Sequence, residues 1–410
     1  MTTTLNPSNQ QKTILGLATL LRMALSGQPL APLSAELIAR AENDPGDAEA
    51  MLDLSTILQI NQQSDLAMRV QADALQLQQI YHLPARQHVT LKLLVIMAAG
   101  PLMANTPIEC LLENSDIAVD LLYIFPPELP LPDELPEHDL VFIAIAESDA
   151  NQLLLEELRK VKWTRPIVNK PELIASLSRD NTYLQLEEIP NLLVPQTNRI
   201  GREALEQSLD VSDEQSIASL LESGVGSIII RPVDSHAGRD LSKLDSAEDM
   251  IDYLRRTPDL DFYVSYFVDF RSEEGNYKKY RIVLIDGTPY LCHMAISDHW
   301  MIHYLNAGMG ESSQKREEEA AMMELFDKDF AARHADALKA IHERIGLDYL
   351  GIDCSETYDG ELLIFEIDSN MVVHDMDSVE LYPYKQPQMH KIFAAFQQML
   401  HNKAASSSVE

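Results

Sequence analysis

The chain has 410 residues, of which 64 are acidic and 32 are Lys or Arg, so its formal net charge is −32. A surface this negative repels phosphate backbones and anionic lipids, which argues against binding to nucleic acid or to a membrane surface. The longest apolar run, Leu93–Ala104, is too short to span a bilayer, which needs about 20 residues. The three cysteines share no close spacing, which is typical of a reducing compartment. We expect a cytoplasmic protein of about two to four domains.

Residues 1–86 are expected to form an α-helical domain. Apolar residues recur at helical spacing, and Asp44-Pro45-Gly46-Asp47 separates two helices. With small residues at Ala50 and Ala67, the segment resembles a single tetratricopeptide unit. Two roles stay open for these helices, namely binding a peptide or protein partner and forming a homodimer contact. A plain helical appendage is the third reading.

Residues 87–168 alternate between strand and helix patterns, which predicts a small parallel sheet. No glycine-rich phosphate loop follows the first strand, so we do not expect a dinucleotide site there. The expected elements are strands at His88–Ala98, Ala118–Phe125 and Asp139–Ala146 and a helix at Asn151–Lys160.

The remainder, residues 169–402, has a mixed α and β pattern and is followed by a tail at 403–410. Asp286-Gly287 and Asp359-Gly360 are turn pairs typical of β-hairpins. The expected strands are Ser227–Arg231, Phe262–Val268, Tyr280–Asp286, Thr288–Ala295, Leu350–Thr357 and Glu361–Ile367, and the expected helices are Ala247–Arg255, Ala332–Ile345 and Lys391–Leu400.

The second of these hairpins carries three carboxylates, Asp353, Glu366 and Asp368. Residues i and i+2 of a strand point to one face, and cross-strand neighbours lie about 5 Å apart, so the three acids can converge. Oxygen ligands without Cys or His favour Mg²⁺. The alternative is a solvated acidic edge, although the apolar neighbours of these acids predict a buried strand.

Two further segments carry groups suited to phosphate and to a nucleotide base. An apolar strand leads to Arg231 and a turn of small residues whose backbone N–H groups can hold phosphate; the alternative is an ordinary strand-to-loop connection. Arg281 lies on a predicted strand, where it can hold phosphate or an acyl-phosphate, and at least one of Lys278 and Lys279 is expected in a solvated loop. The candidates for nucleotide contact are Ser235, His236, Gly238, Tyr266, Phe267 and Asp269.

The order of these segments resembles the ATP-grasp superfamily, of the glutathione synthetase and D-alanine–D-alanine ligase type, over residues 88–400. Asp353, Glu366 and Asp368 match the magnesium ligands, although the last is usually asparagine. Arg281 matches the arginine of the family's hairpin. The two nucleotide lysines fall near Arg179 and at Arg231, where arginine keeps the charge but changes reach and hydration.

The resemblance implies an α+β fold, in which an ATP-grasp domain is preceded by a small parallel α/β (pre-ATP-grasp) domain and by the N-terminal helices. It implies a carboxylate–amine ligase that uses ATP and Mg²⁺ on an amino acid, a peptide or another small carboxylate. The alternatives are a degenerate nucleotide-binding scaffold and an ATP-grasp kinase. Candidates for substrate contact are His303, Asn306, Gly308 and Asn370, with His374 and Asp375 following the metal strand.

Overall fold

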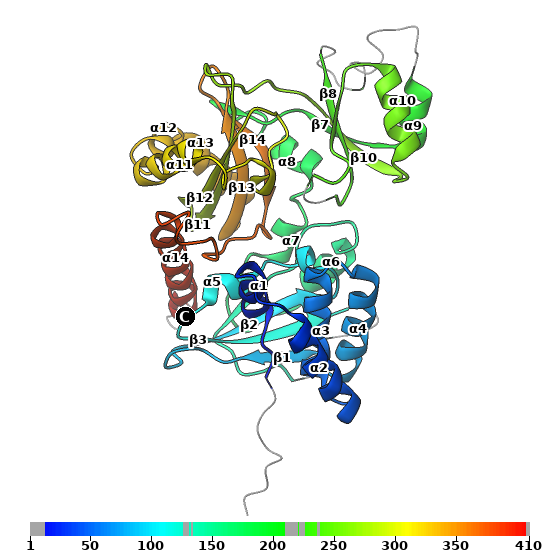
Figure 1. The fold of residues 1–410 in the computed structure, drawn as a ribbon, viewed down its shortest axis with the longest axis vertical. Helices are drawn as coiled ribbons and strands as arrows, with labels where there is room; N and C mark the ends of the chain where they lie inside the picture. The colour runs from blue at the N-terminus through cyan, green and yellow to red at the C-terminus, as the bar shows by residue number, and fades with distance from the viewer. Residues whose placement is uncertain are drawn as a thin grey trace, which may run out of the picture.

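The computed structural model describes residues 13–125, 131–132, 134–209, 220, 226–235 and 238–406. Figure 1 shows N-terminal helices beside a first sheet in the lower part of the molecule, and two further sheets in the upper part. The predicted α+β class, with helices first, a largely parallel sheet second and mixed elements after it, is confirmed.

The third of the four N-terminal helices contacts the other three, and together they have a small core of their own. The predicted break at residues 44–47 is confirmed, and Asp47 caps the following helix by accepting a hydrogen bond from the N–H of Ala50 at 3.0 Å. Their tetratricopeptide character stays a prediction. The helices are α1 (Leu17–Leu25), α2 (Ala31–Asn43), α3 (Ala48–Ile60) and α4 (Ser64–Leu77).

The first sheet has the strand order β1-β3-β2-β4-β5, in which the last four strands are parallel. β1 (Ile80–Leu83) runs antiparallel to β3 at the edge. The sequence assigned this stretch to the helical part, because four residues are too few for strand alternation to register. The other elements are β2 (Leu91–Ala98), η1 (Leu102–Ala104), α5 (Ile108–Leu112), β3 (Ile117–Ile124), β4 (Leu140–Ile143), α6 (Gln152–Leu158) and β5 (Ile167–Val168).

The second sheet is small and antiparallel, with the order β7-β10-β8-β9, and its core is separate from the main core of the molecule. The helices α9 and α10 cover it on one side (Figure 1). Its elements are β7 (Thr197–Gly201), α9 (Arg202–Ser208), β8 (Ile228–Pro232), β9 (Ser242–Leu244), α10 (Ala247–Arg256) and β10 (Asp261–Tyr266).

The third sheet has the order β12-β11-β13-β14-β6 and joins the first sheet in one continuous core. The strands are β6 (Leu192–Leu193), β11 (Tyr277–Ile285), β12 (Thr288–Ser297), β13 (Tyr349–Glu356) and β14 (Leu362–Asp368). The surrounding helices are α7 (Pro171–Ile174), α8 (Arg179–Leu186), η3 (Tyr304–Asn306), α11 (Ser313–Leu325), α12 (Phe330–Arg333), α13 (Ala335–Ile345) and α14 (Lys385–Ser406).

The helical expectations differ from the structure in three ways. The predicted helix Ala332–Ile345 is two helices, because the chain leaves helical geometry at His334. α7, α8, α9 and α11 were not expected from the sequence. α14 begins at Lys385 and ends at Ser406, so it includes residues 403–406 of the predicted tail. It packs on both large sheets, and this tertiary support extends it beyond the apolar stretch visible in the sequence.

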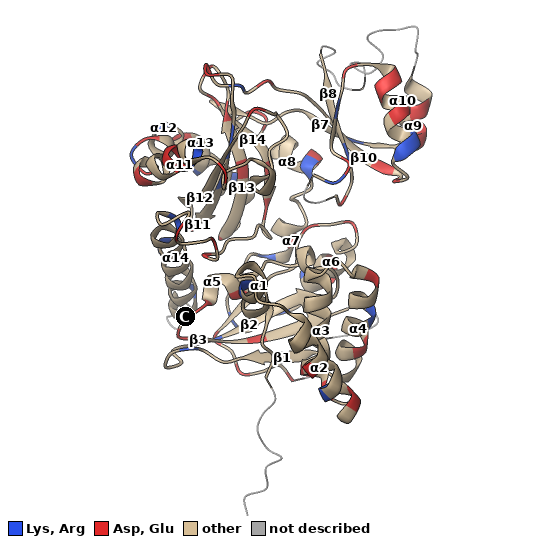
Figure 2. Cartoon of the chain, in the orientation of Figure 1, with Lys and Arg blue, Asp and Glu red and all other residues tan. Residues whose placement is uncertain are grey.

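Both predicted hairpin turns are present, since β11 pairs with β12 and β13 with β14. Asp286 and Gly287 have φ of 46° and 75°, which is the left-handed pair that a two-residue hairpin requires. Within the described residues, no helix is long and apolar enough to cross a membrane. Acidic residues lie on outer helices such as α10 (Figure 2).

Candidate active site

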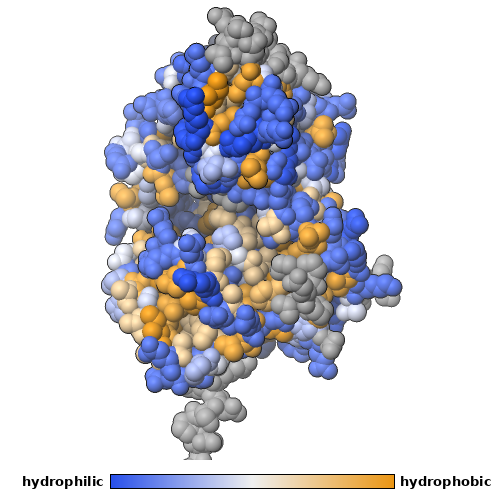
Figure 3. All heavy atoms as spheres, turned by 90° about the vertical axis from the view of Figure 1, so that its right-hand side faces the viewer, coloured by the Kyte–Doolittle hydropathy of each residue, from blue (hydrophilic) through white to orange (hydrophobic). Residues whose placement is uncertain are grey.

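A cavity of about 550 Å³ lies between the second and the third sheet. β8 and β10 line one side, β11, β13 and β14 line the other, and α8 lies at the junction. Figure 3 shows that the molecule is hollowed between its upper and lower parts. A volume of this size is ordinary for a small-molecule or cofactor site.

Basic residues slightly outnumber acidic residues in the cavity, whereas acidic residues predominate in the whole chain. Five Lys or Arg and four Asp or Glu line it, whereas the chain has twice as many acidic as basic residues. The cations are Arg179, Arg231, Lys279, Arg281 and Lys385. A site with this composition attracts an anionic ligand into a protein that otherwise repels it.

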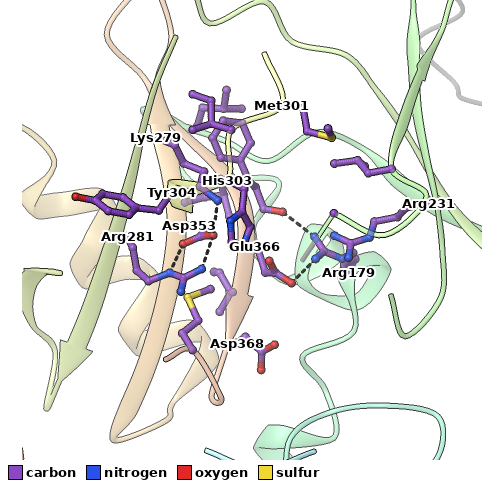
Figure 4. A pocket seen from close by; sticks show the side chains of 18 of the residues that line it. Arg179, Arg231, Lys279, Arg281, Met301, His303, Tyr304, Asp353, Glu366 and Asp368 are labelled. Carbon is purple, nitrogen blue, oxygen red and sulfur yellow. Dashed lines mark hydrogen bonds and ion pairs between the residues drawn. The ribbon is translucent and has the colours of Figure 1, made fainter. Parts of the chain in front are cut away.

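Arg281 and Lys279 both bind Asp353 (Figure 4). Arg281 Nε lies 2.8 Å from Oδ1, and Lys279 Nζ lies 2.8 Å from Oδ2, which also accepts a bond from Arg281 Nη2 at 3.0 Å. Burial alone would raise the pKa of Asp353, but Arg281 and Lys279 hold it well below its usual value. Asp353 is therefore a buried carboxylate with both oxygens already paired.

Lys279 is a site residue that sequence reasoning missed. Both Lys278 and Lys279 lie on β11, which begins at Tyr277 and leaves neither lysine in the expected loop. Lys278 pairs with Glu318 on the outer face, and Lys279 points into the cavity. The signal was present, because Lys279 is two residues from Arg281 and strand alternation puts them on one face.

Arg179 and Arg231, predicted to replace the nucleotide lysines, both line the cavity. Arg179 is the first residue of α8 and pairs with Glu366, while its second terminal nitrogen donates to the carbonyl of Phe365 at 2.9 Å. Arg231 donates from Nε to the hydroxyl of Ser235 at 3.0 Å. Burial, followed by repulsion from Arg179, lowers the pKa of Arg231 to about 10.

The predicted trio of acids is brought to one cavity but not to one point. Asp353 and Glu366 are direct cross-strand partners, as expected, and Asp368 lies opposite Gly351. In the part of the chain that the structure describes, no group of three or more His, Cys, Asp and Glu side chains is placed to hold a metal ion. Asp353 is paired with two cations, so it does not fit the role of an open metal ligand.

Glu366 and Asp368 fit a divalent cation better. Burial raises the pKa of Asp368 to about 7, and repulsion from Glu366 raises it further, although backbone N–H groups and the more distant Arg179 act in the opposite direction. Among the described residues, no cationic side chain forms an ion pair with Asp368. Burial also favours protonation of Glu366, but Arg179 and Arg231 bring its pKa below the usual value. Glu366 and Asp368, of which Asp368 has no ion-pair partner among the described residues, are therefore the remaining candidates for Mg²⁺ ligands.

The other predicted nucleotide contacts divide into two groups. Gly238, Tyr266 and Phe267 line the cavity, and Phe267 packs edge-on against Trp300. Ser235 is buried behind Arg231 and holds its side chain, whereas Asp269 pairs with Arg271 outside the cavity. His236 lies outside the described residues.

The predicted substrate residues are also divided. His303, Asn306 and Asn370 line the cavity, whereas Gly308 does not. Asn306 uses its side-chain oxygen to accept the N–H of His303 at 3.0 Å, and His303 Nδ1 accepts the N–H of Leu305, so the pair shapes the loop. Burial, then Lys279 and Arg281, lowers the pKa of His303, which keeps this histidine neutral near pH 7.

The sequence missed a polar cluster at the start of α14. Lys385 is buried, donates to Asp377 at 3.0 Å and lies 3.9 Å above the ring centre of Tyr304. Buried Glu319 accepts bonds from the hydroxyls of Tyr304 and Tyr384. Lys385, Asp377 and Tyr304 line the cavity, together with His374, which was a candidate, whereas Asp375 does not. Only the tertiary fold brings these distant residues together.

No family model matches the sequence, and no curated protein matches it. Among solved structures, the chain is similar to a RimK domain ATP-grasp protein from Sphaerobacter thermophilus, at 14% identity and a TM-score of 0.43, over 75% of this chain and 99% of that one. It is similar to D-alanine–D-alanine ligase from Bacillus anthracis, at 12% identity and a TM-score of 0.45, over 78% and 98% of the two chains. It is also similar to the VanG D-Ala:D-Ser ligase from Enterococcus faecalis, at 12% identity and a TM-score of 0.47, over 77% and 100%. The chain is thus similar to an ATP-grasp protein and to two ligases over about three quarters of its length.

Proposed function

We propose that this protein is an ATP-dependent carboxylate–amine ligase that forms an amide bond on an amino acid, a peptide or a related small acid. The observation that carries the proposal is the cavity between two β-sheets, in which five cationic side chains gather in a chain of net charge −32. A triphosphate is the kind of ligand that such a set of cations selects.

The nucleotide is assigned to the side of the cavity formed by the second sheet and α8. The chain at Tyr266 and Phe267 offers backbone groups and aromatic rings for the base. Arg179 and Arg231 are placed for the phosphates, and Ser235 fixes the direction of Arg231. Guanidinium groups bind phosphate oxygens in two-pronged fashion, so the two arginines replace lysines without loss of charge.

The reaction is assigned to the opposite side, at Arg281 and Lys279. An oxygen of the substrate carboxylate attacks the terminal phosphorus of ATP, the bond from that phosphorus to ADP breaks, and an acyl-phosphate forms. The nitrogen of an amine then attacks the acyl carbon, phosphate leaves, and the nitrogen loses a proton to solvent. Arg281 and Lys279 stabilise negative charge on the transferred phosphoryl group, and Asp353 holds both cations in place. Mg²⁺, when bound at Glu366 and Asp368, would neutralise phosphate charge.

The test is release of ADP and phosphate from ATP in the presence of a panel of amino acids, dipeptides and small acids, with the product identified by mass. A ligase gives ADP, phosphate and an amide product that requires both acid and amine. An amide-free phosphorylated product would instead indicate the kinase alternative. Nucleotide binding without turnover on any panel member would indicate the scaffold alternative.

Two variants tie the activity to the cavity. Arg281→Met is expected to lower turnover at least about 100-fold, because a charge that stabilises the transition state is lost. Arg271→Met is the matched control, since Arg271 is an exposed arginine that pairs with Asp269 outside the cavity. Equal turnover in the two variants would refute the assignment of the reaction to this site.

A further inference from the structure

The N-terminal helices reach the wall of the cavity through one arginine. Arg22 lies on α1 and pairs with Glu113, and its Nη2 also donates to Asp375 Oδ1 at 2.5 Å. Arg22 and Asp375 are 353 residues apart in the sequence. The side chain of Asp375 is only 10% exposed, so this contact is shielded from solvent on the acid's side.

Asp375 lies in the middle of a segment that forms part of the cavity wall. Met371, Val373, His374 and Asp377 line the cavity, and Asp375 itself does not. Asp375 instead accepts a second bond from His390 Nε2 on α14, at 3.1 Å. Asp375 therefore links this segment of the cavity wall to α1 through Arg22 and to α14 through His390.

The contacts of Asp375 help to position two polar side chains of this segment that line the cavity, His374 and Asp377. The N–H of Met376 donates to His374 Nδ1 at 3.1 Å, so neutral His374 carries its proton on Nε2 as a donor. Burial is the main cause that lowers the pKa of His374 and keeps it neutral. On the other side of Asp375, Asp377 accepts a bond from Lys385 at 3.0 Å. A shift of Asp375 would move both.

α1 is also fixed at its start, which makes it a rigid support. Asp53 accepts bonds from the N–H groups of Leu15 and Gly16 at 2.8 and 3.1 Å. Glu109 accepts the N–H of Ala18 at 3.2 Å. The helix is thus held at its first residues by two acids and at its last turn by Arg22.

We propose that Arg22 is a positioning residue for the substrate side of the cavity, so that the N-terminal helices form part of the ligase site. This rests on the proposed function. The wall that Arg22 supports offers a hydrogen-bond donor, His374, beside a carboxylate, Asp377, which together suit a substrate bearing both an oxygen acceptor and an ammonium group. An amino acid or a peptide has that chemistry.

The experiment compares Arg22→Met, Arg22→Lys and Asp375→Asn in the full-length chain. Arg40→Met is the matched control, because Arg40 is a similarly exposed arginine of the same helices that pairs with Asp47 and does not contact the wall. Arg22→Met and Asp375→Asn are each expected to raise the KM for the active panel substrate about tenfold, the effect of losing one charged hydrogen bond. The KM for ATP should change less than about twofold, since Arg179 and Arg231 do not depend on this wall.

Two readouts separate positioning from a merely structural role. Arg22→Lys should recover part of the KM. The double variant should have nearly the same KM as either single variant, because each single variant already removes the Arg22–Asp375 ion pair. The proposal would be overturned if Arg22→Met changed the KM for the panel substrate and the KM for ATP equally, or if it lowered stability without changing either KM.

Hydrogen exchange needs no substrate, so it tests the positioning role of Arg22 separately from the proposed ligase function. The amide of Met376 should exchange about tenfold faster in Arg22→Met and in Asp375→Asn than in the wild type, and at the wild-type rate in Arg40→Met. Unchanged exchange in the first two variants would overturn the positioning role whether or not the protein is a ligase.

Discussion

Replacement of Asp353 by asparagine tests the central ion cluster of the cavity. Asparagine keeps the shape of the side chain and removes its charge. Lys279 and Arg281, whose side chains are 15% and 22% exposed, would then face each other without a counter-ion. Asp353 itself is 2% exposed, so water has little access to the centre of the cluster to solvate the two cations once the carboxylate charge is removed.

Breaking a buried ion pair by removing one partner costs about 3–5 kcal/mol. The lower end applies here, because both cations are partly exposed, and we expect the free energy of unfolding to fall by about 3 kcal/mol. At about 2 °C per kcal/mol, the unfolding midpoint should fall by about 6 °C. Arg281→Met should cost less in Asp353→Asn than in the wild type, because its partner is already lost.

The assay is thermal unfolding without nucleotide and without added metal, followed by circular dichroism. Asp269→Asn is the control, since that carboxylate pairs with Arg271 at the surface and should cost less than about 1 kcal/mol. Because the pKa of Asp353 is depressed, its contribution is complete above the pKa of an unfolded aspartate and is lost only as the pH falls through the folded value. The loss should therefore be equal at pH 6 and pH 8. A metal-free Asp353→Asn variant as stable as the wild type would refute the role of Asp353 as the anchor of two cations.

The remaining predictions concern α1 and the nucleotide arginine. Burial raises the pKa of Glu109 to about 7, so between about pH 4.5 and pH 7 the folded state holds a proton that the unfolded state has lost, and the free energy of unfolding falls as the pH rises. Glu109→Gln should remove this pH dependence and raise the free energy of unfolding at pH 8 by about 2–3 kcal/mol, measured by urea unfolding. Gly16 has φ +81° and ψ 165°, and an added Cβ would lie 2.3 Å from Glu109 Oε2, so Gly16→Ala should cost about 2 kcal/mol or more, whereas Gly27→Ala, in open space, should cost less. Arg179→Met should weaken ATP binding about tenfold or more in calorimetry, because one phosphate contact is lost and Glu366 is left unpaired; unchanged affinity would contradict the assignment of the nucleotide.

The longer strands of this protein could be predicted from periodicity and turn residues. Both ends of β13 and of β14 were expected to within one residue, and the register confirms that Asp353 lies opposite Glu366. Side-chain alternation on a strand is a local property, so it survives in the sequence. β1, β9, α8, α9 and α11 were not expected. Most of these elements are short, and α11 has polar residues in its first half and apolar residues in its second half, so it shows no helical periodicity.

The sequence by itself determined most of the longer strands and which charged residues share a strand face, because backbone sterics and alternation act between near neighbours. Only the tertiary structure decided how those charges pair. Lys279 and Arg281 neutralise Asp353, Arg179 neutralises Glu366, and Asp368 is left without a cation, so three acids that look equivalent in the sequence have different roles. Ion pairing depends on distances between residues far apart in the chain, and burial sets its strength; neither quantity is encoded in local spacing.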